Sequence, residues 1–216
     1  MQRTVVLDDE LDADLRALAT VEFTLVYAGP LRATQGDPQP GSSQRTRHAD
    51  LKHQMRMEFS RQLKTLWDVV PQFQVAQQIE RHPFNIERSK ALFQILPWCF
   101  VPVVNKAGSL CASLDITLLR RDHPGPSVWR PSAGDIDNRL KTLIDALRMP
   151  NAHDGYSTRT PDGDGTLYCL LEDDDLVTGL SINTDRLLAA PDDADLSYAH
   201  VTVRVKLRLA RDHIPL

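Results

Sequence analysis

Strand-like and helix-like segments follow one another along this chain without a regular strand–helix–strand succession. Residues 111–121 and 199–209 alternate between apolar and polar side chains, as strands with one buried face do. Residues 134–150 instead repeat their leucines and isoleucines at the spacing of a helix. Regular alternation of strands and helices would predict a parallel sheet. Its absence predicts an α+β fold, with a mixed, mostly antiparallel sheet on which helices pack.

Hydrophobic periodicity also predicts the residue ranges of the other elements. Further helices are expected at 1–20, 48–67 and 87–94. Further strands are expected at 21–27, 100–104, 167–171 and 176–183. Loops are expected at 33–47 and over most of 70–96. Gly29 and Pro30 predict the end of the first strand, because both residues commonly interrupt regular structure.

One domain accounts for most of the chain. Its 216 residues are enough for a substantial core, and neither a repeat nor a linker divides them. The first 20 residues are acidic and are expected to form a short extension. The sequence therefore predicts a single domain over residues 21–216, with an enlarged N-terminal part and a turn-rich insertion at 151–166.

The sequence predicts a soluble, cytoplasmic protein without a membrane segment. No stretch approaches the roughly 18 to 20 apolar residues that a membrane helix needs, and the N-terminal region is acidic where a signal peptide would be basic. Cys99, Cys111 and Cys169 are odd in number and form no CxxC pair. We therefore expect buried free thiols and neither a zinc ribbon nor a redox dithiol.

Charge is unevenly distributed along the chain, although the net charge is only −4. Residues 1–20 hold 2 basic and 5 acidic groups, residues 21–130 hold 14 and 9, and residues 131–216 hold 9 and 15. A basic middle beside an acidic final third is compatible with a polyanion surface next to a metal-binding site, and equally with ordinary solvated faces.

The helix expected at 134–150 begins with a pair of carboxylates. Asp135 and Asp137 stand one residue apart where a loop passes into the helix, and such carboxylates can converge on one Mg²⁺ ion. Plain capping of the helix is the alternative, because its dipole favours acidic residues there. Lys141 lies one turn after Asp137, away from the leucines, where it could contact a phosphate or simply pair with Asp137 or Asp145.

A second acidic motif precedes the strand expected at 176–183. Glu172 and the three aspartates that follow it put four like charges in a row, so the run is either fully solvated or partly neutralised by a cation.

Taken together, the two motifs resemble the RusA family of Holliday junction resolvases. The resemblance lies in the string DIDNRLKTLIDAL from Asp135 onward and in DDDLV from Asp173, and it extends over about residues 111–185. It implies a RusA-like fold in which Asp135, Asp137 and Asp174 are the catalytic, metal-binding carboxylates. It also implies that Lys141 is catalytic and that Asn138 and Asp173 support the site.

The resemblance implies a Mg²⁺-dependent endonuclease that hydrolyses phosphodiester bonds in branched DNA, as in recombination and repair, with Mn²⁺ as a possible replacement. It further implies a homodimer. Such hydrolysis needs an activated water and neutralisation of the phosphate charge, which carboxylate-bound metal and a lysine supply. Six basic residues are candidate phosphate contacts, with solvated surface as the alternative: Arg45, Arg47, Lys52, Arg56, Arg130 and Arg139.

Other functions fit the residues less well. The Asp162–Gly165 turn begins like an EF-hand loop but lacks the required glycine and the final glutamate. No Walker A, HExxH or G-x-S-x-G motif occurs in the sequence. The open alternatives are a nucleic-acid-binding accessory protein that kept the fold but lost or altered the activity, and a nuclease or phosphohydrolase on other DNA, RNA or nucleotides.

Overall fold

The structure is a computed structural model that describes residues 2–33, 43–121, 136–151, 154–161, 163–192, 194 and 196–210. Of these, the side chains of residues 2–9, 43–45 and 157 are not described. The α-helices are α1 (Gln2–Leu18), α2 (Ser43–Val69), α3 (Pro71–Gln78), α4 (Ile86–Leu92) and α5 (Ile136–Leu147). The strands are β1 (Glu22–Pro30), β2 (Gln94–Ile95), β3 (Trp98–Val104), β4 (Leu110–Arg120), β5 (Thr166–Leu171), β6 (Val177–Arg186) and β7 (Tyr198–Leu209). Short 3₁₀ turns, η4 (Tyr156–Thr158) and η5 (Asp174–Leu176), flank β5.

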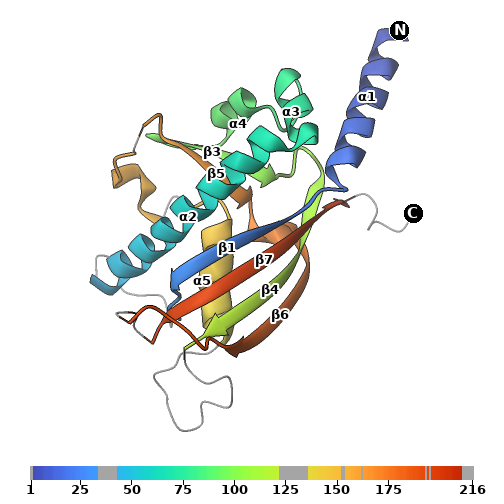
Figure 1. Ribbon diagram of the computed structural model, residues 1–216. Helices are drawn as coiled ribbons and strands as arrows, with labels where there is room; N and C mark the ends of the chain where they lie inside the picture. The colour runs from blue at the N-terminus through green and yellow to red at the C-terminus, as the bar shows by residue number, and fades with distance from the viewer. Residues whose placement is uncertain are drawn as a thin grey trace.

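The strands form two sheets with helices packed on them, which confirms the predicted α+β class (Figure 1). The larger sheet has the order β1-β7-β4-β6, and only its β4–β6 pair is parallel. The smaller sheet has the order β2-β3-β5, with β3 and β5 parallel. The larger sheet is therefore mixed and mostly antiparallel, as the sequence predicted, whereas the division into two sheets was not predicted.

One core joins the helices and both sheets. The inner side chains of β7 alternate with exposed ones, and they pack with Leu18 of α1, Phe59 of α2 and Leu143 of α5. Because burial of apolar side chains is the main favourable contribution to folding, α1 belongs to this packing unit although its first turns project away from the sheets (Figure 1). Within the described residues, no helix is long and apolar enough to span a membrane.

Three expected boundaries differ from the structure. β1 continues through Gly29 and Pro30, since it pairs with β7 as far as Pro30 opposite Tyr198, and proline is tolerated on an edge strand. Residues 71–78 form α3 where a loop was predicted, because Pro71 occupies a first helical position, which its fixed φ favours. α2 begins at Ser43 within the loop predicted at 33–47, and residues 34–42 of that loop lie outside the described part.

Candidate functional site

The first candidate element is the N-terminal half of α5. Leu143, Ala146 and Leu147 face the core, while Asp137 and Lys141 are exposed on the other side of the helix, as their spacing predicted. Lys141 forms no ion pair with another described residue. Asn138 is half-buried, and its carbonyl oxygen accepts a 3.0 Å hydrogen bond from the hydroxyl of Thr142. Asp135 and Arg130 lie outside the described residues.

The second candidate element is the acidic run between β5 and β6. The Asp173 carboxylate caps η5 by accepting a 2.9 Å hydrogen bond from the Asp174 backbone N–H. The Nζ of Lys106 lies 2.9 Å from an Asp175 carboxylate oxygen and 3.5 Å from one of Asp173, and Glu172 accepts the Lys106 backbone N–H at 2.7 Å. Asp174 is exposed. The repulsion expected in this run is thus partly neutralised by one lysine.

These contacts shift the pKa values of Asp173 and Lys106. Partial burial tends to raise the pKa of Asp173, but hydrogen bonding with Asp174 and the charge of Lys106 outweigh it and hold that pKa below its ordinary value. The hydrogen bond to Asp175 raises the pKa of Lys106, and the charges of the neighbouring carboxylates add to the rise. Asp173 and Lys106 are therefore both charged near neutral pH.

The two candidate elements lie at opposite ends of the larger sheet. Just beyond the end of α5, Arg148 forms an isolated β-bridge with Leu171. The backbone N–H of the next residue, Glu172, donates to the carbonyl of Val104, which lies close to the start of β4. In contrast, the hydroxyl of Thr142, in the middle of α5, donates to the carbonyl of Arg32. Arg32 follows the end of β1, which lies at the same end of the sheet as the end of β4.

Because a helix rises about 1.5 Å per residue, Asp137 lies roughly 16 Å along α5 from Arg148. Carboxylates on one Mg²⁺ ion must both approach to about 2.1 Å, so Asp137 and Asp174 of one chain do not share a cation in this arrangement. Consistently, no cluster of three or more His, Cys, Asp or Glu side chains in the described part of the chain is placed to hold a metal ion. Carboxylates suit Mg²⁺ or Mn²⁺ chemically, but the two described members of the predicted set, Asp137 and Asp174, do not lie together in a single chain, while Asp135 lies outside the described residues.

Of the predicted phosphate contacts, Arg56 and Arg139 are buried and Lys52 is half-buried. Arg139 is 4% exposed, and the side chains of Lys52 and Arg56 are 15% and 4% exposed. A phosphate contact needs an accessible cation, so the burial of these three side chains disfavours their predicted role. Arg47 is exposed on α2, whereas the side chain of Arg45 lies outside the described part.

Lys52 and Arg56 instead join α2 to the segment after α5. Lys52 Nζ lies 3.4 Å from carboxylate oxygens of both Asp145 and Asp154, and Arg56 donates to Asp154 at 3.2 Å and to the Asp145 carbonyl at 2.6 Å. The guanidinium of Arg56 also lies over the ring of Tyr156, 5.4 Å from its centroid. This ion-pair cluster (Lys52, Arg56, Asp145 and Asp154) was not predicted, because its members lie up to 102 residues apart and share no local pattern.

Burial and charge compete at Asp154. Its burial alone would raise the pKa, but the charges of Arg56 and Lys52 and the N–H of Asn151 outweigh that effect and keep the pKa below its ordinary value. The carboxylate is therefore a structural anion that fixes the start of the 151–166 insertion against α2.

Comparison of the chain with protein-family models, curated proteins and solved structures gives no match. The resemblance to RusA resolvases therefore depends on the two sequence motifs alone.

Proposed function

We propose that this protein is a metal-dependent endonuclease that hydrolyses phosphodiester bonds in DNA, with branched DNA as its substrate. The observation that carries the proposal is the outer face of α5, where the Asp137 carboxylate and the Lys141 ammonium are exposed one helical turn apart. A carboxylate for a divalent cation beside a cation for phosphate oxygens is the pairing that phosphoryl transfer requires. Asp174, exposed at the other motif, and Asp135 complete the proposed catalytic residues.

Each residue has a defined part in the proposal. Asp137 would hold a cation at the start of α5, and Asp174 would hold one at the acidic run. When bound, such a cation supplies an activated water and stabilises the leaving oxygen. Lys141, which has no carboxylate partner among the described residues, is available to neutralise a non-bridging phosphate oxygen. Asn138 and Asp173 would orient their neighbours, through the Thr142 hydrogen bond and the capping of η5 respectively.

The test is cleavage of a labelled four-way DNA junction, with linear duplex and single-stranded DNA as comparison substrates. We expect the wild-type protein to cut the junction in Mg²⁺ and not in EDTA, and Asp137→Asn to lose at least about 100-fold in rate. Asp68→Asn is the matched control, because Asp68 is an exposed carboxylate on α2 outside both motifs. Equal cleavage by Asp137→Asn and wild type would overturn the proposal.

The second candidate is a nucleic-acid-binding accessory protein without cleavage. The observation that favours it is the distance between Asp137 and Asp174 within one chain, which leaves a single copy without a complete ligand set. Junction binding without cutting in any metal would support this candidate. Cleavage of RNA or plain duplex with the junction left intact would support the catalytic residues but show that branched DNA is not the substrate.

A further inference from the structure

His48, near the start of α2, differs from the other histidines that the structure describes. The rings of His53, His82 and His200 each lie within hydrogen-bond distance of a tyrosine hydroxyl or a backbone N–H. The ring of His48 is half-buried and forms no hydrogen bond or ion pair with any residue in the described part of the chain. Both of its nitrogens are therefore available to a ligand, and the neighbours of the ring decide which one.

Contacts with Asp145 set the direction in which α2 runs past α5 (Figure 1). Lys52 Nζ lies 3.4 Å from the Asp145 carboxylate, whereas Arg56, one turn later, donates to the Asp145 carbonyl at 2.6 Å. A side chain leans toward the start of its helix and a carbonyl points toward its end, so the two helices run in the same general direction. One turn back on each helix leads from Lys52 to His48 and from Asp145 to Lys141. His48 therefore lies at the level of Lys141.

Arg32 links the same two regions independently. Its backbone carbonyl, just after β1, accepts the hydroxyl of Thr142 on α5 at 3.1 Å. Its guanidinium is close enough to His48 for the positive charge to act on the ring. Arg32 thus lies between the start of α2 and the first half of α5, where Asp137 and Lys141 are exposed.

The proposed catalytic side chains of α5 lie on the side of that helix that meets α2. Asp137, Lys141 and Asp145 follow one another at intervals of four residues, so they share one side of the helix. Asp145 is the member of this row that contacts α2, through Lys52. Asp137 and Lys141 continue the row toward the start of α5, alongside His48.

The environment of His48 favours a neutral ring. Burial lowers its pKa, and the positive charges of Lys52 and Arg32 lower it further. Because the ordinary value is about 6.5, the ring is unprotonated at neutral pH and can accept a proton there. The charged groups around the ring, among the described residues, come from three segments: Lys52 of α2, Arg32 after β1, and Asp137 and Lys141 of α5.

We propose that His48 is the general base of the endonuclease reaction and accepts a proton from the water that attacks the phosphate held at Lys141. The water oxygen forms a bond to phosphorus, its proton passes to a ring nitrogen of His48, and the bond from phosphorus to the leaving ester oxygen breaks. The leaving oxygen takes up a proton from solvent, and His48 then releases its proton to solvent. This inference rests on the proposed function, and it gives α2 a part in a site to which neither sequence motif assigned it.

The test is the pH dependence of kcat/KM for cleavage of the four-way junction in Mg²⁺. In the wild-type protein, kcat/KM is expected to rise with pH through a value below about 6.5 and then to level off, because only the neutral ring accepts a proton. His48→Gln keeps a polar side chain without a basic nitrogen, so it is expected to lose at least about 100-fold in kcat/KM together with that rise. Added imidazole is expected to restore part of the rate of His48→Ala, which a merely structural role of the ring would not allow.

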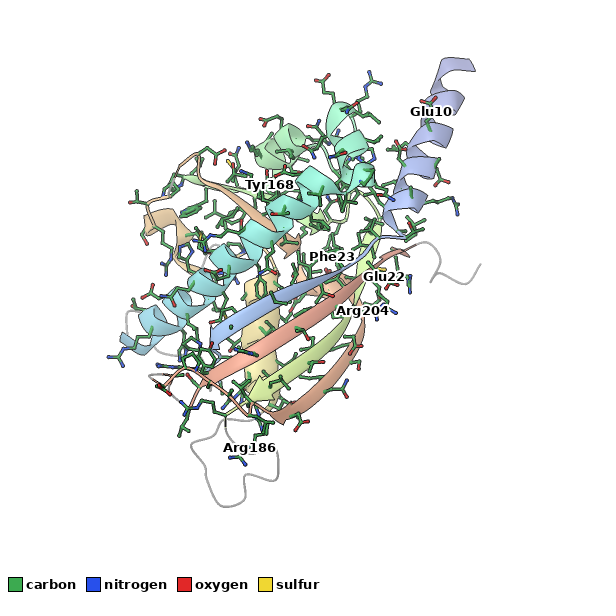
Figure 2. The ribbon with its side chains drawn as sticks, viewed as in Figure 1. Glu10, Glu22, Phe23, Tyr168, Arg186 and Arg204 are labelled. Carbon is green, nitrogen blue, oxygen red and sulfur yellow. The ribbon has the colours of Figure 1, made fainter. Side chains whose placement is uncertain are left out.

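His200→Gln is the matched control. His200 alternates with the buried residues of β7 and so lies on the outer face of the larger sheet, away from α5. On that face Arg204 pairs with Glu22 of β1 at 2.9 Å (Figure 2). This variant is expected to cleave at the wild-type rate and to keep the wild-type pH profile. Cleavage by His48→Gln with the rate and pH profile of the control would overturn the role of His48.

NMR titration follows the ring without any cleavage. The His48 signal, identified by its loss in His48→Gln, is expected to titrate in the free protein with a pKa below 6.5 that agrees with the rise in kcat/KM. A pKa above 6.5 would overturn the base role. The two proposals fail in different ways: cleavage that is unchanged in His48→Gln would retain the nuclease and reject the base, whereas a wild-type protein that cuts no nucleic acid would reject both.

Discussion

Asp154 shows how a single buried residue fixes a long insertion. Its carboxylate meets Lys52 and Arg56, both on α2, and also accepts the backbone N–H of Asn151 at 3.2 Å. Loss of one member of a buried ion pair leaves the other charges without a partner, which costs more than the pair itself contributes.

Asp154→Asn is therefore expected to lower the free energy of unfolding by about 3 kcal/mol, as measured by urea denaturation. Asp175→Asn, which also removes a carboxylate but at an exposed position, is expected to change it by less than about 1 kcal/mol. Because the folded-state pKa of Asp154 is lowered, its contribution is present above the ordinary carboxyl pKa and is lost as pH falls through the folded value. Equal effects of the two variants would show that the cluster does not hold the insertion.

His82 predicts a second dependence of stability on pH. Its side chain is fully buried; Nδ1 accepts the Phe84 backbone N–H at 3.2 Å, and Nε2 has no hydrogen-bond partner. Burial lowers its pKa, although the charge of Asp14 acts in the opposite direction. The folded state thus favours the neutral ring. The free energy of unfolding is therefore undiminished by His82 above the unfolded pKa of about 6.5, and it decreases as the pH drops below that value.

We expect the free energy of unfolding to decrease between pH 7 and pH 5, and His82→Phe to reduce that slope. The measurement is urea denaturation of both proteins at several pH values in this range, where the carboxyl groups titrate little. A slope that is unchanged in the variant would assign the pH dependence to other groups.

At the residue scale, exposure was harder to predict than chemistry. The outward position of Asp137 and Lys141 follows from helical spacing alone, so it was predictable. Arg56 is charged and was assigned to the surface, yet it is buried by an aspartate about a hundred residues away in the sequence. Spacing within one helix carries no information about such a partner.

Among the elements, α4 depends on one side chain that connects it to α3. The Asn85 carboxamide oxygen caps α4 by accepting the Arg88 backbone N–H at 3.0 Å, and its Nδ2 donates to the Gln77 carbonyl near the end of α3 at 2.9 Å. Both helices are short and have little stability of their own.

Asn85→Ala removes both hydrogen bonds and is expected to lower the free energy of unfolding by about 2 kcal/mol. Asn85→Asp keeps the capping acceptor and loses only the donor to Gln77, so a loss of about half that size is expected. Thermal and urea denaturation of the three proteins provide the comparison. A larger loss in the aspartate variant than in the alanine variant would contradict the capping role.

The elements that the sequence predicted well are those with long, regular periodicity. α5 and β7 have buried side chains at a strict helical or alternate spacing, and their observed bounds lie close to the expected ones. α3 was missed because Pro71 is equally common in loops and at helix starts, and only its contacts with α2 decide between the two. The division into two sheets was likewise not predictable, since strand pairing depends on contacts between distant segments.

On the scale of the whole molecule, the question is whether α1 is an appendage or part of the folded unit. The sequence predicted an extension at residues 1–20, yet Leu15 and Leu18 are buried in the core that also contains side chains of α2, β7 and α5. A core shared by the two termini of the chain should lose its structure in one cooperative transition.

Leu18→Ala is therefore expected to lower the free energy of unfolding of the entire protein by about 3 kcal/mol, because it leaves a cavity at a fully buried position. Leu188→Ala is the matched control: the same substitution at a leucine that is 92% exposed should change the value by less than about 0.5 kcal/mol. Denaturation followed by tryptophan fluorescence reports the change, since Trp67 and Trp98 lie in the parts of the core around α2 and β3. If α1 were an independent extension, Leu18→Ala would not change the midpoint of the unfolding transition that tryptophan fluorescence reports. A shift would show instead that the acidic N-terminal segment helps to hold the larger sheet together.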